Sequence, residues 1–165
     1  EDMRARGLEP SSRLLDTATL TADVELAAVF DVAVGEPLVR IDRLRLADGT
    51  PFAIERSTLL DRAVPGILDV DLAAASLYEV LDRDHGIRFD AGRQSIRAAI
   101  AKPGDAAILE LASGDAVLEL VRTSIAGGIV VEHTVSTYPG ARFELSASIA
   151  PVTADGSARS ALRAR

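Results

Sequence analysis

The chain has 165 residues, of which 25 are acidic and 18 basic, so it carries a formal charge of −7, and it contains no cysteine. This length fits one domain with a sizeable core, and the absence of thiols excludes disulfides and thiolate metal or redox centres. Two histidines are too few for a histidine-built metal cage, no apolar run reaches the roughly 18 residues of a membrane span, and the negative charge disfavours direct binding of nucleic acid.

The first half of the chain predicts a helix and then a hairpin. Apolar residues recur at helical spacing over residues 22–30, and Thr21 precedes them as a cap. The alternation of residues 38–46 predicts a strand, Asp48-Gly49 is a strong turn signal, and residues 52–60 form the return strand.

The second half predicts two helices among strands. The first helix follows the capping-box spacing of Ser76 and Glu79 and stops at Gly86; the second begins at Pro103 and ends at Gly114. The predicted strands are residues 88–101, 116–125, 129–138 and 142–149. Strands linked by hairpins indicate an α+β domain, an antiparallel sheet flanked by helices, rather than a doubly wound sheet.

The two ends of the chain lie outside this pattern. It opens at Glu1 without a signal-like hydrophobic stretch, which indicates a piece of a longer polypeptide. Residues 151–165 have little to bury. We therefore expect one domain over residues 1–150 and a disordered tail over residues 151–165.

Arg43 and Arg45 are the strongest functional signal. They share one face of the predicted strand with Val39 and Ile41, which should point toward the core. A single arginine on a strand commonly lies at an edge, with its stem over apolar surface. Two guanidinium groups on an apolar face instead need carboxylate or phosphate partners. The pair predicts an anion site.

The register of the hairpin decides which residue meets Arg43. A two-residue Asp48-Gly49 loop sets Arg43 opposite Ile54, whereas a three-residue loop ending at Thr50 sets it opposite Glu55. We favour the second register because Glu55 then faces the arginines. The alternative role for Glu55 is purely structural, as a counter-charge to Arg43.

Two further segments carry candidate site residues. Ser76, at a helix N-terminus, places a hydroxyl beside unpaired backbone amides that suit a phosphate or carboxylate, although capping alone explains it. On the predicted strand 129–138, Glu132 and Tyr138 share one face with two hydroxyl side chains. That face is either solvated or lines a polar pocket, and the alternation alone favours solvation.

Short motifs are spread over most of the chain in a fixed order. They are Arg43-Leu44-Arg45, Ala47-Asp48-Gly49-Thr50-Pro51, the strand of Glu55, Ser76-Leu77-Tyr78, Gly86-Ile87, Val131-Glu132, and Tyr138 with Gly140, Arg142 and Phe143. In these motifs the chain, from residue 1 to about residue 149, resembles the UTRA effector-binding domain of HutC-subfamily GntR transcriptional regulators. The aminosugar-phosphate-sensing branch is the most similar.

The resemblance implies a chorismate-lyase-like fold that binds a small metabolite, dimerises and is not an enzyme. The effector-binding residues that it implies are Arg43, Arg45 and Ser76 for the phosphate, and Glu55, Glu132 and Tyr138 for sugar hydroxyls. It also implies a cytoplasmic regulator that uses no cofactor or metal. A winged-helix domain absent from this chain would contact operator DNA, and the effector would be a sugar phosphate such as glucosamine 6-phosphate or N-acetylglucosamine 6-phosphate.

Two alternatives remain open. The first is a chorismate-lyase-like enzyme that binds a small dicarboxylate through Arg43 and Arg45, with Glu55 or Glu132 moving the proton. Against an enzyme, the chain has no serine or aspartate at a catalytic spacing from its histidines and no glycine-rich phosphate loop. The second alternative is a dimerisation module with a vestigial pocket.

Overall fold

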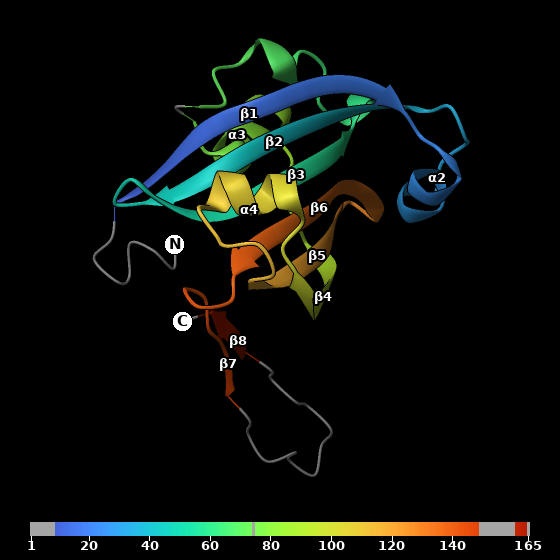
Figure 1. The fold of residues 1–165 in the computed structure, drawn as a ribbon. Helices are drawn as coiled ribbons and strands as arrows, with labels where there is room; N and C mark the ends of the chain where they lie inside the picture. Colours follow the sequence, from blue (N-terminus) through green and yellow to red (C-terminus); the bar gives the residue numbers. More distant parts are fainter. Residues whose placement is uncertain (1–8, 74, 149–160, 165) are drawn as a thin grey trace.

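A computed structural model describes residues 9–73, 75–148 and 161–164, and its main feature is a six-stranded antiparallel sheet of order β1-β2-β3-β6-β5-β4 (Figure 1). The strands are β1 (Pro10–Thr21), β2 (Pro37–Ala47), β3 (Thr50–Leu60), β4 (Ala91–Ile100), β5 (Ala116–Ala126) and β6 (Ile129–Pro139). The α-helices are α2 (Val24–Phe30), α3 (Leu77–His85) and α4 (Pro103–Leu109), and the short 3-10 helices are η1 (Asp61–Ala63) and η2 (Ile67–Asp69). The predicted α+β class is confirmed.

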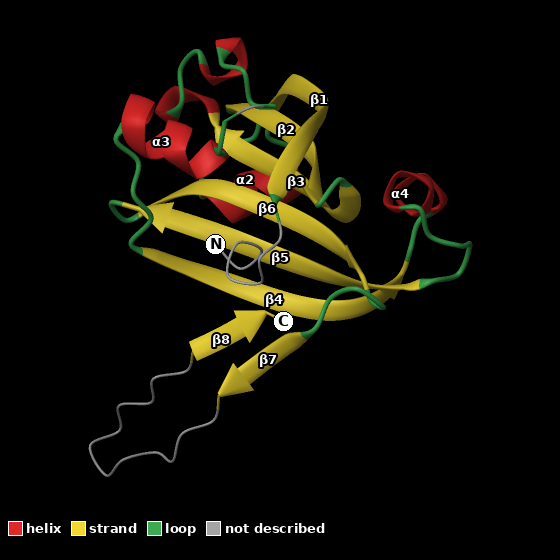
Figure 2. Cartoon of the chain, turned by 90° about the vertical axis from the view of Figure 1, so that its left-hand side faces the viewer, coloured by secondary structure: helices red, strands yellow, loops and turns green. Residues whose placement is uncertain are grey.

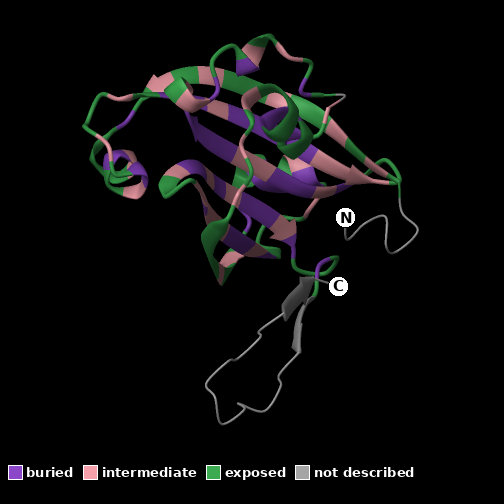
Figure 3. Cartoon of the chain, turned by 180° about the vertical axis from the view of Figure 1, so that it is seen from behind, coloured by how far each residue is buried: buried purple, intermediate pink, exposed green. Residues whose placement is uncertain are grey.

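The helices cover both faces of the sheet. Helices α3 and α4 lie on opposite sides of it (Figure 2). Leu77, Val80 and Leu81 of α3 pack against Val39 and Ile41 of β2 in the largest apolar cluster. As Figure 3 shows, buried residues concentrate along the central strands.

The opposite face has smaller apolar clusters, one of which joins Ala106 of α4 to Ala101 and Val117. There Phe30 of α2 packs with Leu38 and Leu60, and Leu109 of α4 packs with Leu44 and Ile54. Because successive side chains of a strand alternate between faces, β2 supplies core residues to both layers.

The hairpin between β2 and β3 has the expected pairing through an unexpected turn. Ala47 pairs with Thr50 across a two-residue turn, in which Asp48 and Gly49 have φ of 49° and 77°. A bulge then shifts the register, so that Arg43 lies opposite Glu55. The predicted pairing of these two residues is confirmed, whereas the predicted three-residue loop is wrong, because the extra residue sits in the bulge.

The starts and ends of two helices differ from the prediction. Helix α2 begins at Val24, and the Asp23 side chain accepts a hydrogen bond from the Leu26 amide at 2.8 Å. The predicted cap, Thr21, is instead the last residue of β1. Helix α4 does not continue to Gly114, because Glu110 takes a left-handed conformation (φ 54°) directly after Leu109.

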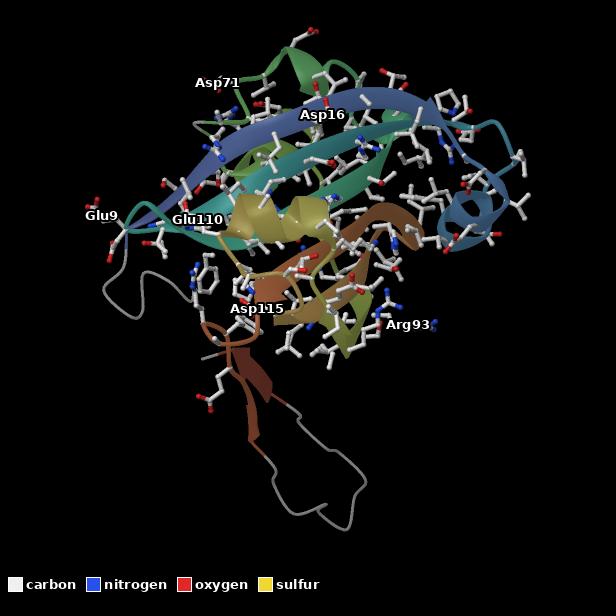
Figure 4. All side chains as sticks on the ribbon, viewed as in Figure 1. Glu9, Asp16, Asp71, Arg93, Glu110 and Asp115 are labelled. Carbon is white, nitrogen blue, oxygen red and sulfur yellow. The ribbon has the colours of Figure 1, made fainter. Side chains whose placement is uncertain are left out.

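The structure adds an edge strand that the sequence pattern did not predict. Strand β1 carries a bulge between Leu14 and Asp16, which interrupts the alternation by which strands are recognised. The other edge strand is β4, whose Arg93 projects away from the sheet (Figure 4).

The last predicted strand is shorter than expected, since β7 covers Leu145–Ser148. Within the predicted tail the structure describes β8 (Ala161–Ala164), which pairs with β7 in a two-stranded antiparallel sheet. The other residues of that tail lie outside the described residues.

Truncation of the α3 contact tests this core. We predict that Leu81→Ala lowers the free energy of unfolding by about 2–5 kcal/mol, because it removes a fully buried side chain and leaves a cavity in its place. Glu79→Ala, on the exposed side of the same helix, should change it by less than about 0.5 kcal/mol. Urea unfolding of both variants measures the difference, and equal losses would contradict the packing.

Candidate functional site

Two arginines on β2 share a single carboxylate oxygen. Arg43 is 4% exposed, and its Nη2 donates to Oε2 of Glu55 at 3.0 Å. Nη1 of Arg45 donates to the same oxygen at 3.4 Å. Among the described residues, Nε and Nη1 of Arg43 and Nε of Arg45 are buried without a hydrogen-bond partner. Burial lowers the pKa of the Arg43 guanidinium, because desolvation disfavours its charged form.

The sheet pairing places polar residues beside this pair. Glu55 lies between Arg43 of β2 and Ser136 of β6 in the register, and Ser57 lies opposite Thr134. Ser57 Oγ and Thr134 Oγ1 are 2.9 Å apart and share a hydrogen bond. Cross-strand partners point to the same face, so these side chains form a polar floor next to the apolar cluster under α3.

Glu132 holds α3 to this floor. Its side chain is 1% exposed, and its Oε2 accepts from Ser124 Oγ at 2.8 Å and from the Tyr78 hydroxyl at 3.2 Å. Tyr78 belongs to the first turn of α3, while Ser124 belongs to β5. The carboxylate therefore links two strands and the helix above them.

Arg122 adds a third guanidinium to the floor. Its Nη2 donates to the Tyr78 hydroxyl and lies 3.6 Å from Oε2 of Glu132, and its Cζ lies 5.2 Å from the centroid of the Tyr78 ring. Its Nε is buried without a partner within the described part of the chain. With Arg43 and Arg45 the floor has three positive charges against two from Glu55 and Glu132, which leaves one positive charge in excess.

Sequence reasoning missed Arg122 and Ser124. The available signal was the alternation of residues 116–125, which places these two on one face. The register that brings this face beside Glu132 comes only from the pairing of β5 with β6.

The solvated interpretation of the 129–138 face is wrong. Glu132, Thr134 and Ser136 are 1%, 2% and 8% exposed. Strand β6 lies in the middle of the sheet, between β3 and β5, and α3 reaches across its polar face. Alternation shows that the face is polar, but it does not show whether another layer covers it.

Tyr138 lies at the aromatic end of the same face. Its ring stacks on Phe143 with centroids 4.1 Å apart and meets Phe52 edge-on at 5.7 Å. Burial, reinforced by the negative charge of Glu55, raises the pKa of Tyr138 to about 12.

Ser76 starts α3 as predicted, but its role as a cap is wrong. It is the N-cap residue by position, and its side chain makes no capping hydrogen bond. It lies exposed two residues before Tyr78, whose hydroxyl reaches Glu132. In the described structure no hydrogen bond or ion pair joins Ser76 to Arg43 or Arg45.

The described residues form neither a metal site nor a membrane-spanning helix. Within residues 9–73, 75–148 and 161–164, no group of three or more histidines and carboxylates could hold a metal ion. No helix in the same ranges combines the length and the apolar character that crossing a membrane requires.

The fold agrees with comparisons to known proteins. A model of the UTRA domain matches residues 5–144. The chain belongs to the UTRA domain family. It is 33% identical over 144 residues to the HTH-type transcriptional repressor NagR of Bacillus subtilis, covering 87% of this chain and 59% of NagR. It is 30% identical over 148 residues to the HTH-type transcriptional repressor PhnF of Mycolicibacterium smegmatis, covering 89% and 60%.

The chain spans about three fifths of the length of these two repressors. Both repressors belong to the GntR family, and the chain is homologous to them. Among solved structures, the effector domain of PhnF from Mycobacterium smegmatis superposes with a TM-score of 0.80 at 30% identity, covering 85% of this chain and 86% of that one. The C-terminal domain of the histidine utilization repressor from Pseudomonas syringae, at 18% identity and a TM-score of 0.78, covers 87% of this chain and all of that one, and it supports the fold alone. The chorismate-lyase-like fold is confirmed.

Titration of the tyrosines tests the burial of this site. Tyr78 and Tyr138 are the two tyrosines of the chain, so the Tyr78→Phe variant isolates Tyr138. We predict that Tyr138 ionises near pH 12 in the folded chain and near pH 10 in urea. Because its folded pKa is raised, the stability it contributes is complete below about pH 10 and is lost as the pH rises to about 12. Ultraviolet absorbance reports both states, and ionisation near pH 10 in the folded chain would contradict the burial.

Proposed function

We propose that this chain is the ligand-sensing and dimerisation domain of a bacterial GntR/HutC-type transcriptional regulator. Its ligand is a small anionic metabolite, and a sugar phosphate such as glucosamine 6-phosphate or N-acetylglucosamine 6-phosphate fits best. The observation that carries the proposal is the arginine pair: Arg43 and Arg45 contact one carboxylate oxygen, and three of their buried nitrogens have no acceptor among the residues that the structure describes.

A phosphate supplies what these arginines lack. Each buried donor without a partner costs about 1–3 kcal/mol, and a phosphate oxygen forms charge-assisted hydrogen bonds with guanidinium N–H groups. The floor also has one excess positive charge, which a phosphate would neutralise. These facts favour an anion over a neutral sugar as the ligand.

The rest of the floor suits a sugar ring. In the contacts described above, Glu55 and Glu132 each use Oε2 alone, so Oε1 of both carboxylates can accept a hydrogen bond from a sugar hydroxyl. The hydroxyl of Tyr138 lies on the same face. Ser76 would add its hydroxyl and the first amides of α3 to the phosphate site. The proposed effector-binding residues are Arg43, Arg45, Glu55, Ser76, Glu132 and Tyr138.

The regulatory part of the proposal extends beyond this chain. The homologous repressors are HTH-type transcriptional repressors and are longer than this chain, so we assign the contacts with operator DNA to a winged-helix domain of the whole protein. That assignment accounts for a sensor with a charge of −7 in a DNA-bound regulator. The effector would act in the cytoplasm on a homodimer, by binding its two arrangements with different affinities. The lyase alternative gains no support, because the homologues are transcriptional repressors.

Thermal unfolding tests the ligand class. We predict that glucosamine 6-phosphate raises the Tm of the chain by mass action, whereas glucosamine without phosphate does not. Arg43→Lys keeps the charge but loses the fork of donors, and it should weaken binding about tenfold or more. Arg93→Ala, on the outer edge strand (Figure 4), should leave the shift unchanged. No Tm shift with any of a panel of sugar phosphates would overturn the proposal, and release of pyruvate from chorismate would favour the lyase.

A further inference from the structure

The face of the sheet opposite the arginine pair contains a cavity. It has a volume of about 530 Å³ and lies between α2 and α4, over strands β2, β3 and β6. This volume is within the usual range of small-molecule sites, about 300–1,000 Å³. Leu26 and Val29 of α2 form an apolar wall, so the cavity is not merely a gap between charged side chains.

A buried hydroxyl in this cavity lacks a partner. Thr137 lines the cavity, is 2% exposed, and its Oγ1 makes no hydrogen bond within the described residues. Its neighbours across the sheet, Ile54 and Glu119, do not satisfy it. Buried hydroxyl groups are normally hydrogen-bonded, because an unpaired one loses its hydration without compensation. Thr137 therefore indicates a polar occupant.

Most charges around the cavity are already compensated. Arg56 donates to both carboxylate oxygens of Asp105, with distances of 3.2 and 2.6 Å. Glu119 accepts from Nε of Arg97 at 2.7 Å. Such pairs form rigid, nearly neutral walls, and neither pair needs a charged ligand.

Two charges of opposite sign remain. Glu25 of α2 and Lys102, directly before α4, both line the cavity and are exposed. Neither forms an ion pair within the described residues. An occupant with only negative charge would meet the carboxylates of Glu25, Asp105 and Glu119. An occupant with only positive charge would meet the cations of Arg40, Arg56 and Lys102.

We propose that this cavity is a second ligand site, separate from the arginine pair, and that it binds a small zwitterion with one ammonium and one carboxylate group. The ammonium group pairs with Glu25, the carboxylate pairs with Lys102, and the ligand completes the hydrogen bonding of Thr137. Strand β6 belongs to both sites, because Ser136 faces the arginine pair and Thr137 faces this cavity.

Thermal unfolding with defined probes tests this site. The probes are the standard amino acids and γ-aminobutyrate, each compared with its N-acetyl and amide derivatives, which lack one of the two charges. We expect at least one zwitterion to raise the Tm of the chain and its derivatives to fail. Glu25→Gln, Lys102→Gln and Thr137→Val should each weaken binding of that probe about tenfold, and Thr137→Ser should restore it.

Two controls separate this site from the arginine pair and from general effects. Arg43→Ala should leave the response to the zwitterion intact, and Glu79→Gln is a matched exposed carboxylate that should have no effect. The proposal is overturned if no zwitterion of the panel shifts the Tm, if the shift survives in both Lys102→Gln and Thr137→Val, or if Arg43→Ala alone abolishes it.

Discussion

The burial of Arg43 constrains the rest of the site. A guanidinium that is 4% exposed needs acceptors, and the fold supplies one oxygen of Glu55, which Arg45 also uses. That arrangement requires the hairpin bulge, because without it Arg43 would lie opposite Ile54. In the folded domain this arrangement leaves buried nitrogens of Arg43 and Arg45 without acceptors among the described residues. An anionic ligand would supply those acceptors.

The polar floor and α3 depend on each other. Tyr78 reaches from the first turn of α3 to Glu132, while Leu81 anchors the same helix in the apolar cluster. The polar contacts fix where the helix begins, and the apolar contacts stabilise it. A ligand that donates a hydrogen bond to Glu132 would therefore act on the helix as well as on the sheet. Strand β6 would transmit such a change to the opposite face, where Thr137 lines the cavity between α2 and α4.

Alternation and turn chemistry predicted the sheet class, the β2–β3 hairpin and the face shared by Arg43 and Arg45, because each depends on residues near in sequence. The bulge in β1 hid that strand. The cover over Glu132 depends on strand order, and the place of Arg122 depends on register between distant segments. Local patterns do not determine either. The resemblance to UTRA domains supplied the candidate residues Glu132 and Tyr138, whereas Arg122 and Ser124 emerged only from the structure.

The central claim is that the arginine pair binds the phosphate group itself. Phosphorus NMR of glucosamine 6-phosphate, titrated with the chain, observes that group directly. The account predicts a saturable change in the phosphorus resonance that disappears when Arg43 and Arg45 are both replaced by alanine in a chain that remains folded. An unchanged resonance at saturating protein, or a change that persists in the double variant, would contradict it.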